Sequence, residues 1–262
     1  MSQAACGVKL FMDSKHLDSA TVERWARQNG LLGRLSPEAF HHLLPALTPV
    51  TLRAEEVLYK PEQQISDIYF PDTAVLCMLT IMEDARSIEA ATVGNEGASW
   101  VSASVGTPTM PCQTMVAVSG RAFKIPAKRV EEELRRNGLF HNLVSEYAHA
   151  LLISSLRTGA CNALHSHTQR AARWLLTTLD RTSNERFCIT QDFMASLLGC
   201  TRTTLNGILF EFEKSGAVQN RRGSIEILDR SVLQNFACEC YETIRHTYTN
   251  LARRADKLLE NR

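Results

Sequence analysis

The sequence lacks any hydrophobic stretch long enough to cross a membrane. No apolar run approaches the ~20 residues that a transmembrane helix needs. The one apolar patch near the start is short and is interrupted by Lys9 and Asp13, so it does not resemble a secretory signal. A cytoplasmic protein is therefore expected.

The sequence also has little excess charge of either sign. Its 262 residues hold 29 Lys and Arg against 28 Asp and Glu, which gives a formal net charge of +1. A protein that binds nucleic acid through bulk positive charge is excluded, so any nucleic-acid site must be a local patch. Hydrophobic residues make up 44% and charged residues 22%, as in folded proteins of one or two domains.

Histidine is absent between Val50 and Ile125, and Lys and Arg are absent from Ser87 to Gly120. The first absence argues against an enzyme built on a cupin-like barrel, because its metal site needs a histidine pair and a carboxylate on neighbouring strands. We therefore expect no catalytic residues, and a protein that is not an enzyme.

Cysteine is present but lacks metal-binding spacing. In a reducing compartment, cysteines that stand alone in apolar stretches are interpreted as small buried hydrophobes. The close pair Cys238 and Cys240 lacks the pattern of a structural zinc site, and the rings of His165 and His167 would not share a helix face. No metal site and no cofactor are predicted. The eight cysteines are Cys6, Cys77, Cys112, Cys161, Cys188, Cys200, Cys238 and Cys240.

Residues 31–127 contain many short β-type segments separated by turn residues, which predicts an antiparallel sandwich or barrel. Residues 1–30 before them are interpreted as an N-terminal extension with one short amphipathic helix. The expected strands lie at 50–52, 57–59, 68–70, 75–81, 87–93, 115–118 and 122–125.

Residues 128–165 have helical periodicity, with a short charged helix and then a long helix from Leu139 to Leu164. The long helix is apolar on more than one side, so it must be covered on more than one side. We expect one side to pack on the barrel and the other on the same helix of a second subunit; burial within one chain is the alternative. The predicted dimer contacts are Phe140, Leu143, Tyr147 and Leu151.

Residues 166–230 are predicted to form a winged helix-turn-helix, and residues 231–262 a C-terminal helix. Thr190 and Thr201 are good N-caps for two helices, and Gly199 lies at the turn between them. Leu205, Ile208, Leu209 and Phe212 give the second helix its inner stripe.

The outer face of this second helix carries the candidate base contacts at its N-terminal end, where a recognition helix meets the major groove. Arg can bind guanine in bidentate fashion, and Asn can bind adenine. Arg221 and Arg222 at the wing tip are placed to meet phosphates. A three-helix unit in an adaptor that binds protein without recognising DNA is the alternative. The candidate helix residues are Thr201, Arg202, Thr203, Asn206 and Gly207.

From about Leu31 to Tyr241 the chain resembles the Crp/Fnr family of bacterial transcription regulators, through its order of elements and the segment ITQDFMASLLGCTRTTLNGIL. The resemblance implies an α+β fold: an eight-stranded, cyclic-nucleotide-binding-like β-roll, a dimerisation helix and a winged helix-turn-helix. It also implies double-stranded DNA with a palindromic operator, and RNA polymerase, as partners.

Arg202 falls on the family's base-contacting arginine. Thr203 replaces a glutamate of many members, and Gly207 replaces a second arginine of the best-known one, so the familiar operator is not expected. The segments EVLYKPEQQISDIYFPDTAV and RRGSIEILDRSVLQNFACECY resemble a proteobacterial subgroup that generally lacks the classical effector chemistry.

The family's cyclic-nucleotide site combines a glycine turn, a glutamate for the ribose and an arginine for the phosphate. Here Ala98 replaces the glutamate, and no cation is available for a buried phosphate. Binding of cAMP is not expected; the effector is unknown, and an effector-independent regulator is the alternative. Because only Cys6 lies near the start, an iron–sulfur sensor is not predicted either. The candidate pocket residues are Gly94, Glu96, Gly97, Cys112 and Gln113.

Overall fold

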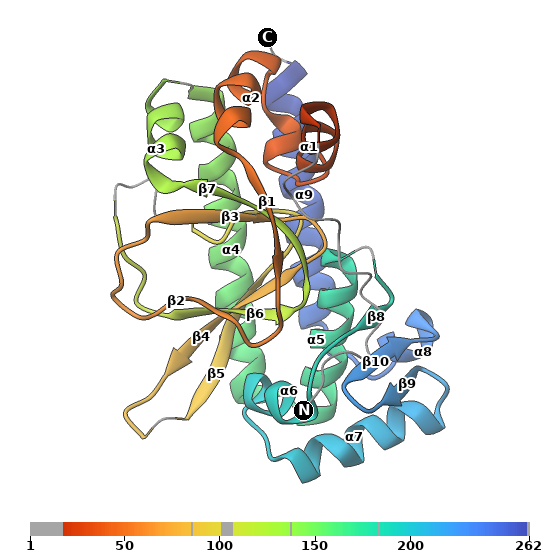
Figure 1. Ribbon diagram of the computed structural model, residues 1–262. Coiled ribbons are helices and arrows are strands. Elements are labelled where there is room, and N and C mark those ends of the chain that lie inside the picture. Colours follow the sequence, from red (N-terminus) through yellow and green to blue (C-terminus); the bar gives the residue numbers. More distant parts are fainter. Residues whose placement is uncertain (1–17, 85, 101–106, 137, 183, 261–262) are drawn as a thin grey trace.

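The computed structural model describes residues 18–84, 86–100, 107–136, 138–182 and 184–260. It has the predicted α+β architecture: a β-roll, a long central helix and a C-terminal helix-turn-helix with a small sheet (Figure 1). Within the described residues, no helix combines the length and the apolarity that crossing a bilayer requires.

The β-roll consists of two antiparallel sheets. One has the order β1-β7-β3 and the other β2-β6-β4-β5. All seven predicted strands are present, with ends shifted by two residues at most. In place of an eighth strand, the described residues show one isolated bridge between Gln64 and Thr109. The strands are β1 (Thr48–Leu52), β2 (Val57–Tyr59), β3 (Asp67–Pro71), β4 (Val75–Ile81), β5 (Ser87–Val93), β6 (Gln113–Val118) and β7 (Gly120–Pro126).

The described residues before position 31 belong to the roll, which corrects the predicted boundary of an N-terminal extension. Helix α1 (Ser19–Ala26) is followed by Asn29, whose side chain is fully buried. Its amide nitrogen donates hydrogen bonds to the carbonyl oxygens of Pro71 and Gly97, each at 2.8 Å. Buried amides need such partners, so this segment is tied into the roll. Residues 1–17 of the predicted extension lie outside the described part.

The remaining helices follow the predicted order. The long helix, α4, has its predicted extent to within one residue, whereas the single C-terminal helix predicted from residue 231 is divided into two helices, α8 and α9. The elements are η3 (Leu32–Arg34), α2 (Pro37–Leu43), η4 (Leu44–Ala46), α3 (Ala127–Arg136), α4 (Gly138–Leu164), α5 (His167–Arg181), β8 (Arg186–Phe187), α6 (Gln191–Leu198), α7 (Arg202–Lys214), β9 (Val218–Arg221), β10 (Ser224–Ile227), α8 (Arg230–Gln234) and α9 (Cys240–Glu260).

Strand β4 is buried on both faces from Val75 to Leu79, which its unbroken apolar run explains. Leu76 and Met78 belong to the core inside the roll, which also includes the N-terminal part of α4. Val75, Cys77 and Leu79 belong to a second core, shared with α5, α6 and α7. The helix-turn-helix is therefore packed directly on the outer face of the roll.

Helix α9 returns from the helix-turn-helix part along α4 toward the N-terminal helices (Figure 1). Leu251 and Ala255 enter the core of the roll. Two half-buried ion pairs add contacts along the way: Arg254 to Glu146 at 3.4 Å, and Arg34 to Asp256 at 3.0 Å.

Candidate nucleic-acid interface

The helix-turn-helix is made by α6 and α7. Thr190 and Thr201 accept hydrogen bonds from Phe193 N and Thr204 N, so each caps its helix as expected. Gly199 ends α6 in the left-handed conformation, with φ of 61°. A residue with a side chain is disfavoured there, which explains the glycine at the turn.

All five candidate base-contacting residues of α7 and its cap are exposed: Thr201, Arg202, Thr203, Asn206 and Gly207. The inner stripe of the helix is buried, as predicted. Phe210 lies one turn beyond Asn206 and is 69% exposed. The exposed face therefore presents a guanidinium, an amide and an aromatic ring. The ring could contact the methyl group of a thymine, a base group that apolar side chains bind in the major groove.

Arg202 already has a partner that the periodicity of α7 did not indicate. Its guanidinium forms an ion pair with Asp192 on α6, at 3.1 Å between Nη1 and Oδ2. Both side chains are exposed, and such a pair contributes about 0–1 kcal/mol. The ion pair orients the Arg202 side chain but does not prevent it from binding DNA, because a base or phosphate group can replace an exposed carboxylate as its partner.

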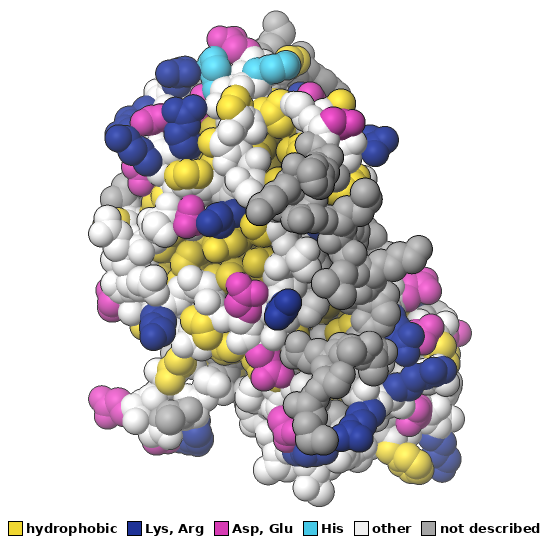
Figure 2. Space-filling model, in the orientation of Figure 1, with side chains coloured by type: hydrophobic (Ala, Val, Ile, Leu, Met, Phe, Trp, Pro, Cys, Tyr) yellow, Lys and Arg dark blue, Asp and Glu magenta, His cyan; other side chains and the backbone are white. Residues whose placement is uncertain are grey.

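The wing is the hairpin of β9 and β10, with β8 on the other side of β10. Gly223 at its tip has φ of 78°, which the tight turn requires. Arg221 and Arg222 beside it are exposed. Figure 2 shows Lys and Arg side chains over this end of the molecule, with acidic side chains among them. The positive charge is local, in agreement with the small net charge.

The predicted dimer contacts on α4 are corrected by the structure. Phe140, Leu143, Tyr147 and Leu151 are all buried within the single chain, as part of the core of the roll. They are the side of α4 that packs on the roll, so they are not available to a second copy.

A different stripe of α4 is free. Leu152 and Leu156 are 56% and 66% exposed. His149, Gly159 and Ala163 are also exposed, so the stripe has the alternating spacing of three and four residues that a coiled-coil seam has. A Cβ at Gly159 would meet nothing within 4 Å, so this part of the helix surface is open.

The glycine turn of the candidate effector pocket is filled by the protein's own side chains. A Cβ at Gly97 would lie 2.0 Å from the ring of Tyr147. Glu96 forms an ion pair with Arg181, the last residue of α5, at 3.0 Å. A cation, which the segment from Ser87 to Gly120 lacks, is thus supplied by α5, and the carboxylate of Glu96 already neutralises it. The two residues also line a cavity of about 400 Å³ beside Tyr248 of α9.

Cys112 and Gln113 do not join this turn. Gln113 is paired with Leu79 of β4, whereas Val93, just before the turn, is paired with Leu76. These positions are three residues apart, or about 10 Å along a strand. The pocket predicted from five residues is therefore not assembled as one site.

A buried contact between the roll and the DNA-binding part was not predicted. Trp174 of α5 is fully buried, and its indole N–H donates a 2.8 Å hydrogen bond to Glu89 of β5. Glu89 is buried as well and accepts a second hydrogen bond, from Thr92. Nothing in the sequence around Glu89 indicated that its partner would be Trp174, 85 residues further along the chain.

Comparison with known proteins identifies the helix-turn-helix. Residues 169–236 match the family model described as the Crp-like helix-turn-helix domain. No curated protein sequence matches the chain.

Several solved structures have the same fold. FixK2 from Bradyrhizobium japonicum has a TM-score of 0.61 at 14% identity, covering 73% of this chain and 98% of its own. A putative Crp/Fnr family regulator from Eubacterium rectale has a TM-score of 0.56 at 17% identity, with coverages of 80% and 98%. A putative cAMP-binding regulatory protein from Silicibacter pomeroyi has a TM-score of 0.54 at 18% identity, with coverages of 83% and 99%.

These matches confirm the predicted resemblance in the fold and in the helix-turn-helix. The chain has the fold of the Crp/Fnr transcription regulators, and its residues 169–236 are a Crp-like helix-turn-helix domain.

Proposed function

We propose that this protein is a sequence-specific transcription regulator that binds palindromic double-stranded DNA in the cytoplasm as a homodimer. The observation that supports this most is the exposed N-terminal face of α7, with Arg202, Thr203 and Asn206, beside a wing that ends in Arg221 and Arg222. RNA polymerase is the further partner that the proposal includes, and no catalytic step is part of it.

The exposed stripe of α4 supports the homodimer. The side chains of Leu152 and Leu156 would be desolvated by a second copy, and the small residues Gly159 and Ala163 allow two helices to approach closely. In such a dimer the two α7 helices would contact half-sites one DNA turn apart.

The filled glycine turn supports a regulator that does not respond to cAMP. Tyr147 occupies the space beside Gly97, and Arg181 is paired with Glu96. A cyclic nucleotide would have to displace a buried aromatic ring and separate a buried ion pair, which costs free energy that a phosphate contact would have to offset. A regulator that needs no small effector is the second form of this proposal.

The assignment of α7 and the wing is tested on DNA selected in vitro from random sequences. Arg202→Ala is expected to cost about 1–3 kcal/mol on the selected site and to relax the preference at one base pair in each half-site. Arg221→Ala and Arg222→Ala are expected to weaken the binding of selected and random DNA equally. They should also reduce the slope of log affinity against log salt by about 0.9 for each phosphate that the variant no longer neutralises.

Lys214→Ala is the matched control, because it removes an exposed cation at the other end of α7. It should leave the base preference unchanged. If Arg202→Ala weakened selected and random DNA equally while a wing variant lost discrimination, the two roles would be reversed. If the wild-type protein showed no salt-sensitive binding of DNA, an adaptor would be the better hypothesis.

The absence of a cAMP response is tested by calorimetric titration of the wild-type protein. We expect no saturable heat with cAMP or cGMP up to millimolar concentration, because the space beside the glycine turn is filled. Saturable binding in the micromolar range would contradict this expectation.

A further inference from the structure

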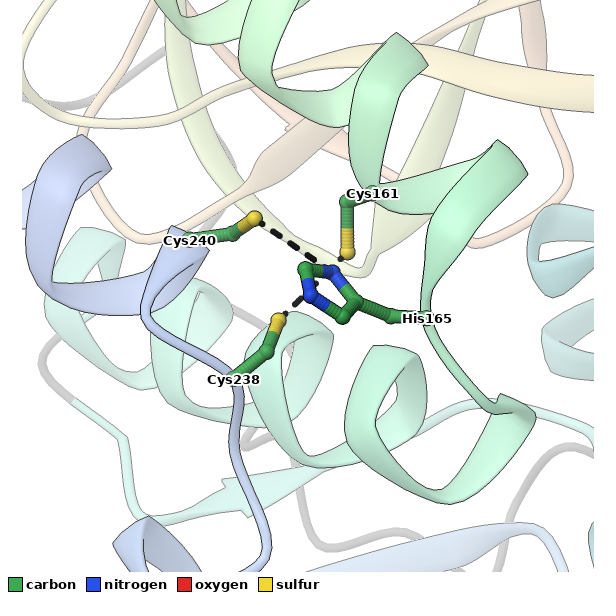
Figure 3. A group of neighbouring side chains, drawn as sticks. All are labelled: Cys161, His165, Cys238 and Cys240. Atoms are coloured by element: carbon green, nitrogen blue, oxygen red, sulfur yellow. Dashed lines mark hydrogen bonds between the residues drawn. The ribbon is translucent and has the colours of Figure 1, made fainter.

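Four potential metal ligands meet where the end of α4 approaches the start of α9 (Figure 3). Cys161 lies in the last turn of α4, and His165 directly follows the end of that helix, where its backbone N–H donates a hydrogen bond to the carbonyl oxygen of Cys161. Cys238 lies in the loop after α8, and Cys240 is the first residue of α9. Figure 3 shows the three sulfur atoms directed toward the imidazole ring. The four ligand atoms all lie within 4.8 Å of one another.

The distances between ligand atoms fit a single tetrahedral ion. The sulfur atoms of Cys161 and Cys238 are 3.6 Å apart, and the sulfur of Cys240 is 3.6 Å from Nδ1 of His165. Zn–S bonds of about 2.3 Å and Zn–N bonds of about 2.0–2.1 Å place two sulfurs about 3.8 Å apart, and a sulfur and a nitrogen about 3.6 Å apart. A disulfide needs about 2.05 Å between sulfurs, so the pair of Cys161 and Cys238 is not one.

The histidine is oriented as a metal ligand would be. Its Nδ1 faces Cys240, and its Nε2 lies 3.4 Å from a carboxylate oxygen of Glu239. Metal-binding histidines commonly donate their other ring N–H to a carboxylate, which fixes the tautomer that leaves the ligating nitrogen free. Glu239 stands between the two cysteines of the loop, so one short segment supplies two ligands and the second partner of the histidine.

The charges around the cluster also point to an anionic centre. Arg170 and Arg173 of α5 are buried, and the Nε atom of each has no hydrogen-bond partner in the described part of the chain. A buried guanidinium needs a nearby negative charge. Three thiolates around a divalent ion leave one net negative charge.

We propose that Cys161, His165, Cys238 and Cys240 bind one zinc ion in a closed, four-coordinate structural site. Thiolates with one imidazole are a typical ligand set for structural zinc, and all four positions are filled by the protein. The ligand span has room for one ion and not for a cluster of several irons. This proposal does not depend on the proposed DNA-binding function, because it rests on the four ligands alone.

The site would link three elements that belong to different parts of the fold. Cys161 lies in the last turn of α4, His165 lies in the short link between α4 and α5, and Cys240 begins α9. An ion there would hold the first and the last helix of the DNA-binding part against the end of α4. The three buried cysteines form only a small hydrophobic cluster of their own, separate from the two larger cores. Metal bonds would therefore supply the stabilisation that hydrophobic packing supplies elsewhere in the fold.

The test uses the full-length protein, purified and reconstituted with zinc under reducing conditions, with bound metal measured by mass spectrometry after gel filtration. We expect one zinc ion per chain. Cys238→Ser and His165→Ala should each lose most of the bound zinc, whereas Cys200→Ser, a half-buried cysteine outside the cluster, should retain it. Wild-type protein without stably bound zinc would overturn the proposal, and so would a variant lacking both Cys238 and Cys240 that still binds one ion.

Cobalt gives a second measurement that needs no variant. Co²⁺ bound to the wild-type protein should show the strong visible absorption of a tetrahedral site and the near-ultraviolet charge-transfer bands of thiolate ligands, and added zinc should abolish both. An octahedral spectrum, or a Cys161–Cys238 disulfide in the reduced protein found by peptide mapping, would contradict the site.

Discussion

Replacing Leu152 and Leu156 together by glutamate is expected to convert the proposed homodimer into monomers and to remove most of its affinity for operator DNA. Both leucines are exposed on the free stripe of α4. In the dimer, the introduced glutamates of the two subunits would lie close together and repel each other, and the apolar contact of the leucines would be lost. Because a dimer binds two half-sites at once, losing one subunit should weaken DNA binding by about 10²–10⁴-fold.

The measurement is light scattering combined with DNA titration. Leu228→Glu is the matched control, since Leu228 is 58% exposed but lies outside α4; it should leave the dimer intact. Tyr147→Glu should instead lose the folded state, because it places a charge in the core of the roll. An unchanged dimer for the double variant would place the interface elsewhere.

Replacing Trp174 by alanine is expected to lower the free energy of unfolding by about 3–5 kcal/mol, the usual cost of emptying the site of a large buried aromatic ring. Trp174 lies in the core shared by the roll and the helix-turn-helix. Trp174→Phe keeps most of the ring but removes the donor to Glu89, so a buried carboxylate oxygen loses a partner at about 1–3 kcal/mol.

Urea unfolding followed by circular dichroism measures both changes. Glu89→Gln is the control, because its amide oxygen can still accept the indole hydrogen bond; its cost should be the smallest of the three. If Trp174→Ala cost less than about 1 kcal/mol, the packing of the two parts against each other would not contribute to stability. A single transition in all variants would show that roll and helix-turn-helix unfold together.

The elements of the fold could be predicted because they are local in sequence. Capping residues such as Thr190 and Thr201, and the left-handed Gly199, mark helix ends by their own chemistry. The extent of β4 was predicted as well, but not that α5 and α6 cover its second face.

Which side of α4 is exposed could not be predicted in this way. The helix is apolar almost all round, so its periodicity does not distinguish the side that packs on the roll from the free side. The large side chains of Phe140 and Tyr147 lie inward, and the leucines Leu152 and Leu156 lie outward. Which of the two sides is buried depends on where the roll packs against the helix.

The remaining unpredicted contacts join residues far apart in the chain. Glu96 meets Arg181, and Cys161 with His165 meets Cys238 with Cys240. Spacing rules apply within one element, so a ligand set divided between the end of one helix and the start of another leaves two incomplete patterns. The interpretation of the cysteines as separate buried hydrophobes followed from that division.

The return of α9 along α4 has a consequence for how the chain is made. Synthesis proceeds from the N-terminus, yet α9 supplies Leu251 and Ala255 to the core of the roll and contacts Arg34 through Asp256. The roll cannot complete its core until nearly the whole chain has left the ribosome. Contacts so distant in sequence slow folding, because the closure of a long loop must precede them. During that delay the nascent roll would expose an apolar surface, and it would be at this stage that a chaperone has a surface to bind.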